Sequence, residues 1–71
     1  MPIQSLIKDI ETSRDRWTAA RDAGQTQYCL NAIQDEIRDG LRRLDNVVWS
    51  RRRAGETVAQ VRARLAPSVD W

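Results

Sequence analysis

Apolar residues recur at helical spacing from the start of the chain. Between residues 3 and 20 they advance by alternate steps of three and four positions, with Ser13 filling one place: Ile3, Leu6, Ile10, Ser13, Trp17 and Ala20. Such a stripe is typical of a helix that packs along a seam against another helix. Gly24 then suits the left-handed position just past a helix end. The pattern predicts a helix over residues 3–23.

A second stripe with the same spacing follows Thr26, a residue that suits the N-cap. Its members, with Leu41 and Val48 widening it on one side, are Leu30, Ile33, Ile37, Gly40, Leu44 and Val47. It predicts a helix over residues 26–53, roughly 40 Å long. Gly40 lowers the helix propensity by about 1 kcal/mol relative to alanine. Close approach of another helix explains this glycine, and so does simple tolerance.

The two stripes align in a single antiparallel register. Folding the chain back at residues 24–26 places Ala20 opposite Leu30, Trp17 opposite Ile33 and Ser13 opposite Ile37. The same register places Ile10 opposite Gly40, Leu6 opposite Leu44 and Ile3 opposite Val47. The sequence therefore predicts an antiparallel helical hairpin.

A third, shorter helix is expected over residues 58–66. Thr57 and Gln60 form a T-x-x-Q capping box, and Pro67 stops the helix before a short tail, residues 67–71. Its apolar stripe is Val58, Val61 and Leu65. The brief connection at residues 54–56 predicts that this helix turns back along the hairpin. There it covers the end built by Ile3, Ile7, Val48 and Trp49.

A helix this short reaches only about 13 Å, so the other end of the hairpin stays uncovered. The sequence thus predicts one all-α domain over residues 1–71 that dimerises into a helical bundle or pairs with a different protein. The residues expected at that interface are Trp17, Ala20, Leu30, Ile33, Ile37, Leu41 and Trp71. For Trp71 the alternative is packing back on its own bundle.

Composition argues against catalysis. The chain of 71 residues has no histidine and one cysteine, so nucleophile–histidine catalysis, a disulfide framework and a four-ligand zinc site are excluded. Cys29 is expected to be a small buried hydrophobe, and the carboxylate pairs Asp35–Glu36 and Glu11/Asp15 are expected on solvated faces. We expect no enzyme activity, no cofactor and no small-molecule substrate.

Charge is uneven along the chain. Residues 1–37 hold four basic and six acidic side chains, whereas residues 38–64 hold eight arginines and three acids. A patch for nucleic acid or an acidic partner is therefore possible at Arg42, Arg43, Arg51, Arg52, Arg53, Arg62 and Arg64. The alternative is a solvated helix end, where cations favour the negative pole of the helix dipole.

Two functions follow as hypotheses. The first is a non-enzymatic interaction module, an adaptor or inhibitor encoded by a phage or mobile element, which binds and modulates a larger protein. The alternative is a nucleic-acid-binding regulator that uses residues 38–64. The chain has no apolar run of membrane-spanning length, and the start of the sequence lacks the form of a signal peptide. With a single cysteine, this favours a cytoplasmic protein without membrane contact.

Overall fold

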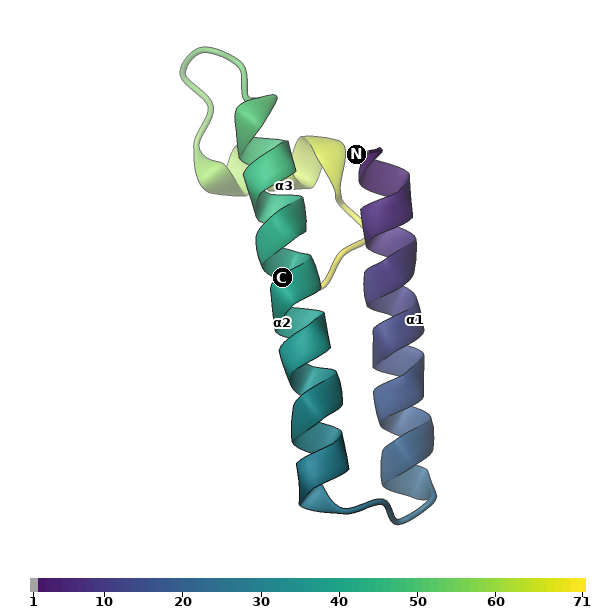
Figure 1. Ribbon diagram of the computed structural model, residues 1–71. Coiled ribbons are helices and arrows are strands. Elements are labelled where there is room, and N and C mark those ends of the chain that lie inside the picture. The colour runs from purple at the N-terminus through teal and green to yellow at the C-terminus, as the bar shows by residue number, and fades with distance from the viewer. Residues whose placement is uncertain (1) are drawn as a thin grey trace.

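The computed structural model describes residues 2–71, and over that range the chain is all-helical without strands. The helices are α1 (Ile3–Asp22), α2 (Gln27–Ser50) and α3 (Val58–Leu65). Helices α1 and α2 run antiparallel and pack along their length, and α3 lies across the end that holds the N-terminus (Figure 1). The predicted all-α hairpin is confirmed. The molecule is elongated, with extents of 47 × 19 × 16 Å.

The turn between the long helices follows the expected chemistry. Gly24 adopts φ +73°, the left-handed region where glycine has no steric penalty. The backbone N–H of Gln25 donates to the carbonyl oxygen of Ala20 at 3.0 Å, which closes the end of α1. The Thr26 hydroxyl accepts a hydrogen bond from the Cys29 amide at 3.3 Å and caps α2.

Helix α2 ends three residues earlier than the sequence predicts. The expected helix 26–53 stops at Ser50, because Arg51 leaves helical geometry with φ −103° and ψ 14°. The Ser50 hydroxyl donates to the Val47 carbonyl at 2.6 Å, and the Arg52 guanidinium donates to the Trp49 carbonyl at 3.0 Å. These bonds satisfy carbonyls that a longer helix would have paired with its own amides. The bounds of α1 and α3 differ from prediction by one residue at the C-terminal end.

The predicted register is confirmed where the two helices approach most closely. A Cβ placed on Gly40 would lie 3.0 Å from Cγ1 of Ile10, its expected partner. That separation is shorter than ordinary van der Waals contact. The glycine is therefore explained by close helix approach, and tolerance alone is no longer needed.

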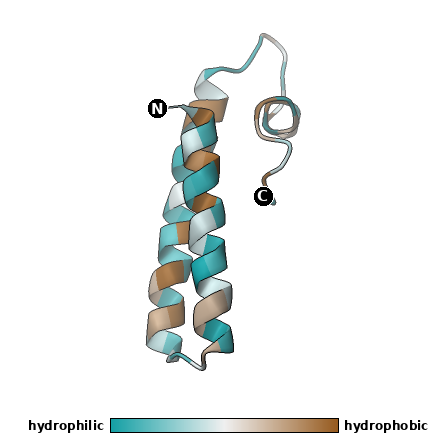
Figure 2. Cartoon of the chain, turned by 90° about the vertical axis from the view of Figure 1, so that its right-hand side faces the viewer, coloured by the Kyte–Doolittle hydropathy of each residue, from teal (hydrophilic) through white to brown (hydrophobic). Residues whose placement is uncertain are grey.

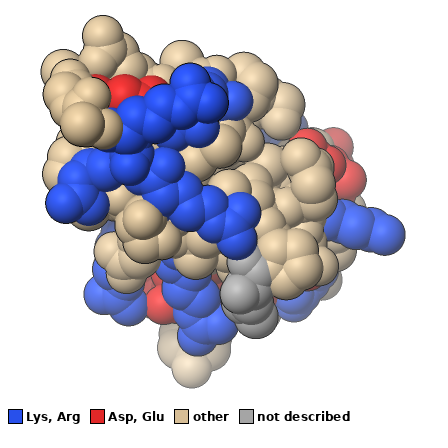
Figure 3. All heavy atoms as spheres, turned by 90° about the horizontal axis from the view of Figure 1, so that it is seen from above, with Lys and Arg blue, Asp and Glu red and all other residues tan. Residues whose placement is uncertain are grey.

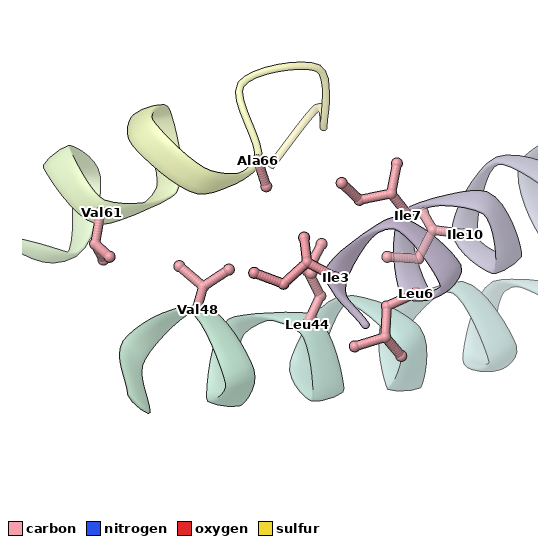
Figure 4. Close-up of a cluster of buried hydrophobic side chains, with 8 residues drawn as sticks. All are labelled: Ile3, Leu6, Ile7, Ile10, Leu44, Val48, Val61 and Ala66. Atoms are coloured by element: carbon pink, nitrogen blue, oxygen red, sulfur yellow. The ribbon is translucent and has the colours of Figure 1, made fainter. Parts of the chain in front are cut away.

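The core occupies one end of the hairpin. Eight hydrophobic residues are buried: Ile3, Leu6, Ile7, Ile10, Leu44, Val48, Val61 and Ala66. Figure 4 shows Val61 of α3 facing Val48, and Ala66, just past the end of α3, facing the side chains of α1. Helix α3 thus packs on α2, and Ala66 joins the cluster beside α1.

Helix α3 crosses the hairpin and does not turn back along it. In Figure 2, α3 is seen end-on while the long helices run vertically. The physical reason is where α3 is anchored: Val61 packs beside Val48, and Arg62 pairs with Asp45 of α2 at 2.9 Å, which holds α3 across the hairpin. The capping box of Thr57 and Gln60 is confirmed. Trp49, expected in the covered end, and Val58, expected in the apolar stripe of the third helix, are 40% and 41% exposed.

Candidate interaction surfaces

The apolar seam continues beyond the core, but its burial does not. No residue from 11 to 43 is buried, although the seam there includes half-buried Trp17, Ile33 and Ile37. We call residues 11–43 the tip half. Because α3 and the C-terminal tail cover only the opposite half, the side chains of the tip half are left at the surface.

One depression of the tip half lies on the side of the hairpin that carries α3. It has a volume of about 390 Å³ and is lined by Trp17, Gln34, Ile37, Arg38 and Leu41. We call it the α3-side groove. Two contacts identify its side: Arg14, one turn from Trp17, donates to the Asp70 carbonyl at 2.6 Å, and Arg62 donates to Asp45 at 2.9 Å. The tail and α3 therefore lie on the same side of the hairpin as this groove.

The second depression lies on the other side of the seam. Its volume is about 590 Å³, and its lining residues are Arg16, Ala19, Ala20, Ala23, Gln25, Tyr28, Cys29, Ala32, Ile33 and Glu36. We call it the alanine face. An ion pair of 2.9 Å between Arg16 and Glu36 crosses it, with side chains 57% and 52% exposed. Cys29 is exposed here, so its predicted burial is wrong: it faces away from the α1–α2 seam.

The structure divides the predicted interface. Trp17, Ile37 and Leu41 line the α3-side groove, whereas Ala20 and Ile33 line the alanine face. The two depressions share no lining residue. Helical periodicity already separates these groups, since seam residues three and four positions apart are displaced by about −60° and +40° around a helix. Residues of one apolar stripe therefore lie on both sides of the seam, some in the α3-side groove and others on the alanine face.

The remaining predicted interface residues lie elsewhere. Leu30 is half-buried near the turn. Trp71 packs back on its own domain, in a depression lined by α3 residues and Pro67, with the Arg62 guanidinium 4.6 Å from its ring centroid. Trp71 is nevertheless 38% exposed, so its place at an interface stays a prediction.

Two arginine side chains lie at the α3-side groove. Arg38 lines it, and the Arg21 guanidinium lies 5.1 Å from the centroid of the Trp17 ring. None of the lining residues is acidic. The indole N–H of Trp17 is buried without a hydrogen-bond partner among the described residues. The groove therefore combines an apolar floor with two exposed arginines at its border, each in an exposed ion pair: Arg21 with Asp22 and Arg38 with Asp35.

The predicted arginine patch is largely neutralised. Figure 3 views the end that carries α3 and shows basic side chains gathered there. Four of its seven arginines have carboxylate partners: Arg42 and Arg43 with Asp39, Arg62 with Asp45, and Arg64 with Glu56. Arg51, Arg52 and Arg53 form no ion pair within residues 2–71, and Arg52 lies 4.4 Å from the Trp49 ring centroid. Within the predicted patch, the arginines without a carboxylate partner are therefore those of the loop that follows α2.

No protein-family model, curated protein or solved structure matches the chain. Among the described residues, no three His, Cys, Asp or Glu side chains group together as metal ligands do. None of the helices described combines the length and the apolar character needed to cross a membrane. The features left as candidate sites are the α3-side groove, the alanine face and the loop that holds Arg51, Arg52 and Arg53.

Glu56 organises the loop between α2 and α3. Its carboxylate accepts hydrogen bonds from Arg64 at 2.7 and 2.9 Å and from the Arg53 amide at 2.6 Å. The same Arg64 donates to the Arg51 carbonyl at 3.1 Å. The hydrogen bonds from Arg64, followed by that from Arg53, lower the pKa of Glu56 from 4.5 to about 2.

We expect Glu56→Gln to flatten the acid dependence of stability. The folded-state pKa of Glu56 is depressed, so its stabilisation is present above pH 4.5 and is lost as the pH falls toward 2. The wild type should lose melting temperature over that window more steeply than Glu56→Gln. Thermal unfolding at pH 5, about 3.5 and about 2 measures the difference, with exposed Glu11→Gln as control. Parallel curves for wild type and Glu56→Gln would contradict the role of this ion pair.

Proposed function

We propose that the protein is a non-enzymatic interaction module that acts as a homodimer and binds and modulates a larger protein, as an inhibitor or adaptor. One observation carries the proposal: the apolar seam runs the length of the hairpin, yet every buried hydrophobic residue lies outside the tip half. Apolar surface rimmed by polar residues is typical of protein-interaction sites.

The size of the domain supports this interpretation. Chains of fewer than about 80 residues build small cores, and additional stability commonly comes from disulfides, metals or association. In the tip half, the side chains of the seam are only half-buried, and they are buried further only when another surface covers them. Burial of apolar area contributes roughly 25 cal/mol per Å². Association at the tip would therefore stabilise the half of the hairpin that α3 leaves open.

The alanine face suits a second copy. Its small residues permit close helix approach, and Ile33 supplies an apolar centre. Arg16 and Glu36 carry opposite charges 2.9 Å apart. A two-fold axis through this face would bring Arg16 of one copy near Glu36 of the other. The face is thus self-complementary in charge, and pairing there would build a four-helix bundle at the tip.

Sedimentation equilibrium of the wild type tests this arrangement. We expect a monomer–dimer equilibrium with the dimer favoured at micromolar concentrations, and with no dependence on added nucleic acid. A mass of one chain across the whole accessible concentration range would contradict the dimer.

A further inference from the structure

We propose that the α3-side groove binds an acidic amphipathic helix of the larger protein. This inference rests on the proposed function and names the chemistry of its partner. The groove differs from the alanine face in both shape and charge, and each difference points to the same occupant.

The shape of the occupant follows from the fold. At the other end of the hairpin, α3 lies on this same side and covers Val48 and Leu44. The groove continues that side into the tip half, where Trp17, Ile37 and Leu41 are half-buried. A helix can present apolar residues at positions i, i+3 and i+7 to such a floor. The incoming helix would cover the tip as α3 covers the core.

The charge of the occupant follows from the border. Arg38 lines the groove and Arg21 lies over the Trp17 ring, so acidic residues flanking the apolar stripe of a helix would meet guanidinium groups. The acidic side chains of this chain compete only weakly with those of a partner for Arg21 and Arg38. Asp22 pairs with Arg21 at 3.3 Å and Asp35 lies 3.9 Å from Arg38, and all four side chains are more than half exposed. Such exposed pairs contribute little and can exchange partners.

A second copy does not suit this groove. Pairing two α3-side grooves about a two-fold axis would bring together Arg21 and Arg38 of both copies. Like charges across an interface oppose association. The alanine face, with Arg16 and Glu36, lacks this conflict. The two tip surfaces therefore differ in the partners that they fit.

The test uses the full chain labelled with ¹⁵N and two synthetic helical peptides. Both peptides carry one leucine stripe, flanked by glutamates in the first and by lysines in the second. We expect the glutamate peptide to shift the Trp17 indole N–H and the amides of residues 34–41, and the lysine peptide to bind at least tenfold more weakly. The double variant Arg21→Glu/Arg38→Glu should bind the glutamate peptide at least tenfold more weakly than the wild type does.

The matched control is Arg51→Glu/Arg53→Glu, which changes net charge equally at the opposite end and should leave peptide affinity within about twofold of wild type. The inference is overturned if the glutamate peptide causes no shifts, if both peptides bind equally, if the shifts map to the alanine face, or if the control loses affinity as much as the groove variant. A chain that still sediments as a dimer but fails this test would leave the proposed function intact and reject only the acidic helix.

Discussion

Ile33→Glu is expected to convert the dimer to a monomer, weakening association by at least 100-fold. The substitution places a carboxylate at the apolar centre of the alanine face, one turn before Glu36. Dimerisation would then bury a charge without a partner, which costs several kcal/mol. A 100-fold loss corresponds to about 2.7 kcal/mol, well within that range.

Gln34→Glu is the matched control, because it adds the same charge at the next residue but in the α3-side groove. It should sediment as the wild type does. Far-UV circular dichroism confirms that both variants remain helical. If Ile33→Glu stays dimeric, or if both variants dissociate equally, the alanine face is not the dimer interface.

Leu44→Ala is expected to remove most of the stability of the domain. Leu44 has 0% exposure and lies between α1 and α3 in the buried cluster. Truncating a buried leucine typically costs about 2–5 kcal/mol through lost transfer energy and the remaining cavity. A core in a domain of this size supplies about 3–5 kcal/mol in total. The variant should therefore be largely unfolded at room temperature.

Leu30→Ala provides the comparison at the tip. Leu30 is half-buried, so the same truncation should cost less than about 1 kcal/mol in the monomer. Urea unfolding at low protein concentration, where the monomer dominates, measures both variants. Equal losses would show that the hydrophobic core extends over the whole hairpin, contrary to the structure.

The sequence predicts the hairpin well because its determinants are local and periodic. Residues three and four apart share a helix face, so the stripes identify the packed sides without any coordinates. Gly40 opposite Ile10 then determines the register, and the structure shows the close approach that this pairing requires. The caps at Thr26 and Thr57 depend on side chains within three residues and were equally predictable.

The crossing of α3 and the division of the tip surface depend on interactions distant in sequence. Arg62 pairs with Asp45 and Arg14 binds the Asp70 carbonyl, and neither pairing has a sequence signature. They hold α3 and the tail on one side of the seam and so distinguish the α3-side groove from the alanine face. Helical spacing identifies apolar residues near a seam, but not which side a third element covers.

Amide hydrogen exchange at two protein concentrations tests the central claim most directly, namely that the tip half completes its packing through association. At low concentration, amides of residues 7–10 and 44–50 should exchange slowly while those of the tip half exchange near the rate of local opening. At high concentration, protection should rise in the tip half alone, with the largest gain along the alanine face. Uniform protection along the hairpin that does not change with concentration would contradict this claim.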